Sequence, residues 1–129
     1  MKKGVLYLNS FYESKSNSDT YRISIARGDF SKIAVVNETM SSLAPSKELF
    51  AFAQRSKGKN YNWFATYSIR YCRQLEQDKK AQGDLEKIME ILNSGKDVEL
   101  LCFCRSYKNC HRSLIGKILE NLDYDVIYE

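Results

Sequence analysis

The sequence predicts an α/β fold: a single-domain, three-layer Rossmann-like arrangement of a mostly parallel sheet flanked by helices. Short apolar segments bounded by charged or turn-forming residues are typical of strands, and they occur beside longer segments with apolar residues at helical spacing. In chain order the predicted elements are three strands, three helices, a strand, a helix and a final strand. This order is typical of a central sheet covered by helices. A chain of 129 residues has the length of one domain, so residues 1–129 are expected to form one.

The N-terminal third is predicted to supply three strands. The first covers residues 4–9 and is apolar almost throughout, as expected of a strand buried on both faces of a parallel sheet. A polar loop separates it from strands at 21–26 and 31–38. Ligands of open α/β sheets bind where loops leave the carboxyl ends of strands. Asn9 and Ser10 are therefore candidate ligand-binding residues.

The first helix is predicted to follow a break at Pro45. Proline forces the preceding Ala44 into an extended conformation, and either Ser46 as a cap or Pro45 in the first turn begins a helix that ends near Ser56. The apolar residues of this helix are expected to face the core. They are Leu49, Phe50, Phe52 and Ala53.

The second predicted helix, residues 61–79, is rich in aromatic side chains. Part of this wide band must be core, while the other rings and their hydroxyl groups are available to a cleft. Tyr67 and Tyr71 are therefore candidate walls of a binding site, and ordinary half-buried aromatics are the alternative. A third helix at 82–93 follows, and Gly95 stands where a C-terminal cap is expected.

The segment from 97 to 122 is the most informative. An apolar strand leads through a polar loop to an amphipathic helix, which brings free backbone N–H groups and the positive end of the helix dipole to one point. Such a point binds anions. The candidate catalytic residues there are Cys110, His111 and Arg112. Candidate ligand-binding residues beside them are Cys104, Arg105 and Ser113. A last strand at 123–128 is predicted at an edge of the sheet.

The composition is that of an ordinary globular protein, with 43% hydrophobic and 28% charged residues. The apolar segments fall far short of the roughly 20 residues that span a membrane, so no membrane partner is predicted and a cytoplasmic location is expected. The four cysteines are expected to be reduced there. A net charge of +4 favours anionic partners and keeps nucleic acid among the candidates.

Two motifs in the last segment carry a resemblance to a known family. The sequence LLC-x-C at 100–104, a polar loop, CHR at 110–112 and an amphipathic helix together resemble the C-terminal signature of the family called domain of unknown function 488. The LAPS sequence at 43–46 and the helix that carries Tyr67 and Tyr71 are similar to elements of one branch of that family.

This resemblance covers roughly residues 23–122. It implies a small α/β domain with Rossmann-like layers and a polar cluster around Cys110, His111 and Arg112. It implies no activity, because none is established for the family. At 103–105 the sequence Phe-Cys-Arg stands where many relatives have an acidic residue and a lysine, so no role that depends on the acid is carried over.

Three interpretations of the cluster remain open. In the first, Arg112, His111 and the first helical turn bind an anion, and Cys110 is a reactive thiol. In the second, thiolate and imidazole groups hold zinc. That set would be Cys102, Cys104, Cys110 and His111, although adjacent residues at a helix start are expected to diverge. In the third, the cluster only fixes the loop.

The functional prediction is a small α/β protein that binds a small anionic ligand, a nucleotide or a phosphorylated metabolite, at the Cys-His-Arg cluster. Cysteine-dependent catalysis is a possible extension, and whether the protein is an enzyme is left open. No cofactor and no metal are predicted. The alternative is a non-catalytic interaction protein that binds nucleic acid or another protein. No glycine-rich phosphate loop or serine triad is present in the sequence.

Overall fold

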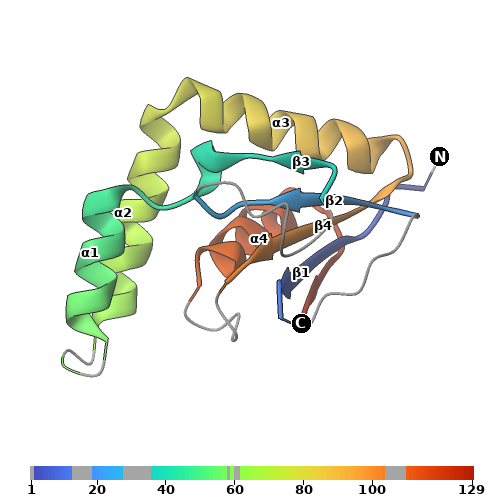
Figure 1. Ribbon diagram of the computed structural model, residues 1–129. Helices are drawn as coiled ribbons and strands as arrows, with labels where there is room; N and C mark the ends of the chain where they lie inside the picture. The colour runs from blue at the N-terminus through green and yellow to red at the C-terminus, as the bar shows by residue number, and fades with distance from the viewer. Residues whose placement is uncertain (1, 13–18, 28–35, 58, 60–61, 104–109) are drawn as a thin grey trace.

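The computed structural model describes residues 2–12, 19–27, 36–57, 59, 62–103 and 110–129 (Figure 1). Within these residues five strands form one sheet in the order β3-β2-β4-β1-β5, and every neighbouring pair is parallel. The strands are β1 (Leu6–Ser10), β2 (Thr20–Ser24), β3 (Glu38–Thr39), β4 (Asp97–Cys102) and β5 (Val126–Tyr128). The predicted parallel sheet is confirmed, and β5 lies at its edge as predicted. The strand predicted at 31–38 meets β3 only at its last residue, and residues 31–35 lie outside the described part of the chain.

Helices flank this sheet, which confirms the predicted α/β class. They are α1 (Lys47–Ser56), α2 (Trp63–Gln77), α3 (Lys79–Asn93) and α4 (His111–Asn121), and a short 3₁₀ helix, η1 (Ser41–Leu43), precedes α1. Figure 1 shows α1 and α2 side by side beyond the carboxyl ends of the strands. In the described residues no helix combines the length and apolar composition that crossing a membrane requires.

Local signals in the sequence explain where the helices begin and end. The Ser46 side chain accepts a hydrogen bond from the Leu49 amide and caps α1, which is the first of the two predicted starts of this helix; Pro45 lies before the cap. Gly95 follows α3 with a φ of 95°, a conformation that favours glycine. The break between α2 and α3 falls at Asp78, earlier than predicted, because its carboxylate caps α3.

Helix α4 lies close against the sheet because Gly116 has no side chain. A Cβ atom at Gly116 would lie 2.6 Å from Cδ1 of Leu8 and 3.0 Å from the hydroxyl of Tyr128. Leu8 is fully buried and has little room to move. This contact fixes α4, whose first turn follows β4, near the carboxyl edge of the sheet.

Candidate functional site

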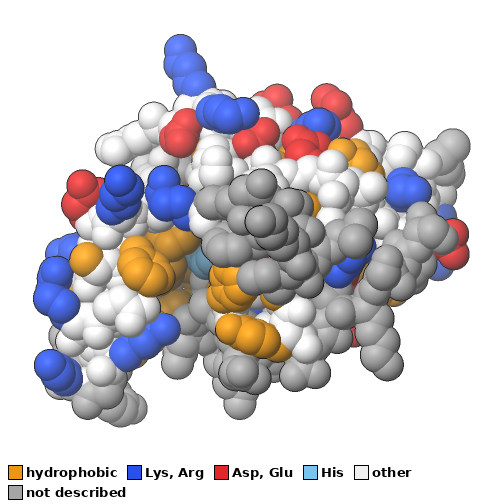
Figure 2. Space-filling view, in the orientation of Figure 1, with side chains coloured by type: hydrophobic (Ala, Val, Ile, Leu, Met, Phe, Trp, Pro, Cys, Tyr) orange, Lys and Arg blue, Asp and Glu red, His pale blue; other side chains and the backbone are white. Residues whose placement is uncertain are grey.

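A cavity of about 400 Å³ lies at the carboxyl edge of the sheet, between the strand ends and helices α1 and α2. Its floor is formed by Cys102 at the end of β4 and by Cys110 and His111 at the start of α4. Figure 2 shows the imidazole of the chain's one histidine at the bottom of a hollow between hydrophobic side chains. The end of β4 and the start of α4 therefore border a partly open space large enough for a small ligand.

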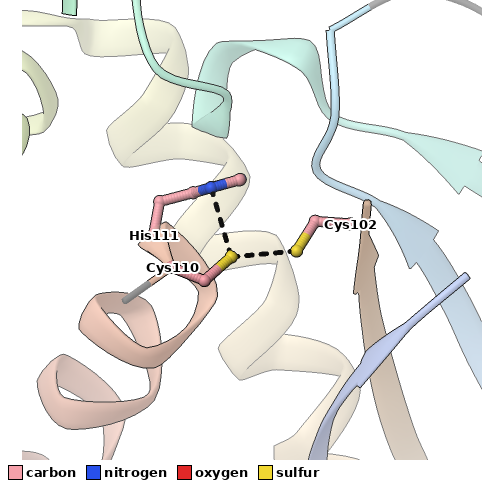
Figure 3. A group of neighbouring side chains, drawn as sticks. All are labelled: Cys102, Cys110 and His111. Carbon is pink, nitrogen blue, oxygen red and sulfur yellow. Dashed lines mark hydrogen bonds between the residues drawn. The ribbon is translucent and has the colours of Figure 1, made fainter. Parts of the chain in front are cut away.

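The three floor side chains converge (Figure 3). The Sγ atoms of Cys102 and Cys110 are 3.0 Å apart, and Sγ of Cys110 lies 3.7 Å from Nδ1 of His111. Cys110 has extended backbone dihedrals as the N-cap residue of α4, whereas His111 is the first helical residue. The expectation that these adjacent residues diverge was wrong, because this change in backbone direction points both side chains at the same place.

The tautomer of His111 follows from its second contact. Nε2 lies 3.1 Å from the carbonyl oxygen of Ile25, just after β2. A carbonyl only accepts hydrogen bonds, so in a neutral imidazole the proton is on Nε2. Nδ1 then carries the lone pair and faces Sγ of Cys110. His111 can accept a thiol proton or donate its lone pair to a metal ion.

Arg112 lies behind the thiols. It is fully buried, it is not among the residues that line the cavity, and its guanidinium donates to Sγ of Cys102 at 3.2 Å and to the main-chain oxygen of Glu129 at 3.2 Å. A buried cation beside a sulfur atom favours negative charge on that sulfur. In this structure Arg112 therefore contacts the floor of the cavity through Cys102 and does not itself line the cavity.

The predicted tyrosines take different positions. Trp63, Tyr67 and Tyr71 follow one another at four-residue spacing on α2, and Trp63 and Tyr67 line the cavity. Tyr71 is fully buried, stacks on Tyr67 and meets the ring of His111 edge-on at 5.7 Å. Its hydroxyl donates to the carbonyl of Leu43, and burial raises its pKa well above 10.0. Tyr67 lines the cavity, while Tyr71 packs behind it, against Tyr67 and the imidazole of His111.

Other predicted residues lie near the floor without lining the cavity. Ser10 is the sheet neighbour of Cys102, and its hydroxyl accepts a hydrogen bond from the Tyr12 amide. Asn9 donates to Glu99. Ser113 donates to the Cys110 carbonyl at 2.7 Å and holds the first turn of α4. Cys104 and Arg105, both predicted to contact the ligand, lie outside the described residues.

Several cavity residues were not predicted. Its aromatic lining includes Phe50 and Phe103, and its basic side chains are Arg27, Lys47 and Lys57. None of the described residues that line the cavity is acidic. Placing Phe50 in the core was wrong, since its side chain is 55% exposed. The missed signal is a second stripe along α1 and its C-cap, beside the buried residues Leu49 and Ala53: Lys47, Phe50, Gln54 and Lys57 recur at helical spacing.

The fold and this floor define a small parallel α/β protein with a thiol–imidazole cluster at the carboxyl edge of its sheet. Residues 6–122 match the family described as the active DUF488-N3 subclade. The match spans most of the chain, which therefore belongs to the domain of unknown function 488 family. Comparison with curated proteins and with solved structures gives no match.

Proposed function

We propose that the protein binds a small anionic ligand with a flat ring, such as a nucleotide or another phosphorylated metabolite, in the cavity. The observation that carries this proposal is the composition of the lining: aromatic walls, basic side chains and no acidic residue among the described lining residues. Aromatic faces stack on planar rings, and lysine and arginine bind phosphate oxygens. The aromatic and the basic side chains of the lining thus favour the same class of ligand, one with a flat ring and an anionic group.

The basic side chains that line the cavity, Arg27, Lys47 and Lys57, would hold the anionic group of the ligand. Arg27 keeps its guanidinium in position by donating to the Pro45 carbonyl at 2.8 Å. Lys57 lies over the ring of Trp63, with Nζ 5.7 Å from the ring centroid. A phosphate near these groups and a ring between Phe50 and Tyr67 would point the ligand at the floor.

We extend the proposal to cysteine-dependent catalysis. A ligand that fills the cavity lies against Cys102, Cys110 and His111, which are the chemically reactive side chains there. A thiolate nucleophile and a metal ion bound by thiolates both make catalysis depend on these cysteines, and metal content decides between them. The family description calls the subclade active without naming a reaction.

Trp63 gives a direct test because it is the only tryptophan and it lines the cavity. Titration with adenosine 5′-monophosphate is expected to change its fluorescence at saturation. Lys47→Glu should weaken this nucleotide's affinity on the order of tenfold, since a charge-assisted contact becomes a repulsion. Adenosine, which has no phosphate, should bind Lys47→Glu and the unaltered protein equally.

Lys96→Glu is the matched control because Lys96 is also exposed and precedes β4, at the opposite edge of the sheet. Equal losses in Lys47→Glu and Lys96→Glu would mean that only net charge matters, and would contradict the proposed site. No fluorescence change with purine or pyrimidine nucleotides or with sugar phosphates would reject the proposal.

The alternative, an interaction protein that binds nucleic acid, would use the same basic residues and rings. It predicts that single-stranded oligonucleotides bind far more tightly than the mononucleotide and that affinity grows with strand length. A cavity of about 400 Å³ that holds one ligand predicts no gain in affinity beyond one nucleotide. The same Trp63 titration with oligonucleotides of increasing length separates these outcomes.

A further inference from the structure

We infer that Cys102, Cys110 and His111 form a zinc site whose remaining coordination position faces the cavity. The three ligand atoms lie within 4.8 Å of one another and are supplied by two elements that pack in the core, the end of β4 and the start of α4. Two thiolates and one imidazole are ligands that zinc prefers, whereas magnesium and calcium require oxygen ligands.

The distances approach those of a tetrahedral site. Zinc–ligand bonds of about 2.3 Å to sulfur and 2.0–2.1 Å to nitrogen place the sulfur and nitrogen atoms about 3.6 Å apart. Cys110 and His111 already have this separation, at 3.7 Å. The same bond lengths place two sulfur atoms about 3.8 Å apart, so the 3.0 Å pair must widen. Sγ of Cys102 lies within 4.8 Å of the imidazole ligand atom and would have to end about 3.6 Å from it, so zinc binding requires a rotation of the Cys102 side chain.

Groups around the three ligands have the arrangement expected around a metal centre. A histidine that binds zinc usually donates its other ring N–H to a carbonyl or a carboxylate, which fixes the tautomer. Here Nε2 of His111 faces the Ile25 carbonyl, and Nδ1 faces the sulfur atoms. The guanidinium of Arg112 donates to Sγ of Cys102 and would stabilise the coordinated thiolate.

The direction of access determines what such a zinc ion would do. All three ligand residues line the cavity, so the fourth position is reached from the space proposed to hold the ligand. A water molecule or an anionic ligand atom bound there would meet a Lewis acid. Cys104 is the next cysteine in the sequence after Cys102 and lies outside the described residues, so its part in the site is tested by substitution. The zinc inference does not depend on the proposed ligand.

Cobalt is a suitable probe because it replaces zinc and reports its ligands by absorption. The full-length protein is reduced, freed of metal with a chelator and titrated with Co²⁺. We expect one equivalent to bind with thiolate-to-cobalt charge-transfer absorption and the visible bands of tetrahedral cobalt, and zinc to displace it. Cys102→Ser and Cys110→Ser should each remove one thiolate contribution, and His111→Ala should weaken binding.

Cys72→Ser is the matched control, since Cys72 is a free cysteine on α2 outside the cluster and should leave the cobalt spectrum unchanged. Cys104→Ser separates an open site from a closed one: unchanged charge-transfer absorption supports an open position, and loss of a third thiolate contribution would overturn it.

Absence of cobalt absorption in folded, reduced protein would overturn the zinc site. So would a Cys102–Cys110 disulfide that forms in air and that zinc fails to prevent. Nucleotide titration in the presence of chelator tests the ligand site independently.

Discussion

Two arginines are buried in the described part of the chain, Arg22 and Arg112, and they have different partners. Arg22 on β2 is 4% exposed, and its Nε donates to the Glu99 carboxylate at 3.1 Å. Arg112 on α4 is fully buried and donates to the thiol of Cys102. A buried charge is costly unless it is paired, and a carboxylate is the stronger partner. Arg22 is paired with a carboxylate inside the sheet. The positive charge of Arg112 instead lies beside the sulfur of Cys102, which lines the cavity.

The pair of Arg22 and Glu99 is part of a hydrogen-bonded network across the sheet. The two residues are opposite one another in the register of β2 and β4, and Asn9 on β1 donates to the second carboxylate oxygen at 3.1 Å. Three neighbouring strands are thus joined through one carboxylate. The two opposite charges are paired within the sheet, and we interpret this network as structural.

Breaking this network is expected to give the largest effect on stability. Glu99→Ala leaves the guanidinium of Arg22 buried without its carboxylate, and should lower the free energy of unfolding by about 3–5 kcal/mol. Urea unfolding followed by circular dichroism measures the change. The folded fraction should keep its affinity for cobalt and for adenosine 5′-monophosphate.

A double substitution sharpens this prediction. Replacing both Arg22 and Glu99 with leucine removes the unpaired charge and should recover much of the stability lost in Glu99→Ala. A double variant no more stable than Glu99→Ala would contradict the description of the network as a closed ion pair.

Removing the charge of Arg112 is expected to have a smaller effect than Glu99→Ala. The effect should appear in the affinity for metal rather than in the free energy of unfolding. Arg112→Met keeps a long apolar side chain but loses the hydrogen bond to Cys102, so cobalt affinity should fall about 10–100-fold, as for other groups that support metal ligands. Lys117→Met, on the exposed surface of the same helix, should not change cobalt affinity. Unchanged cobalt affinity in folded Arg112→Met would show that Arg112 only fills space.

The sequence predicted the fold well because its signals are local. The apolar strand at β4 and Gly95 after α3 each depend on a few adjacent residues and were confirmed, and of the two predicted starts of α1 the structure has the Ser46 cap. The boundary at Asp78 was displaced because an aspartate cap competed with a continuing helical pattern. The convergence of Cys110 and His111 depended on the extended N-cap backbone, which residue types alone do not determine.

The cavity itself was harder to predict because residues distant in sequence build it. Ala26 follows β2, Lys47 and Phe50 lie on α1, and Cys102 ends β4. Only the packing of α1 and α2 beyond the strand ends brings them together. The exposed stripe on α1 was visible in the sequence, yet nothing in its spacing showed that it would face the thiols.

The most direct test of the central claim, that Cys102, Cys110 and His111 act as one centre, uses the chain's only histidine. A long-range proton–nitrogen correlation spectrum of the reduced, metal-free protein contains a single imidazole. The structure predicts a proton on Nε2, held by the Ile25 carbonyl, and none on Nδ1. Adding one equivalent of zinc should shift the Nδ1 resonance strongly and leave Nε2 protonated. A neutral imidazole with its proton on Nδ1 instead of Nε2 in the metal-free protein, or no response of Nδ1 to zinc, would contradict this account.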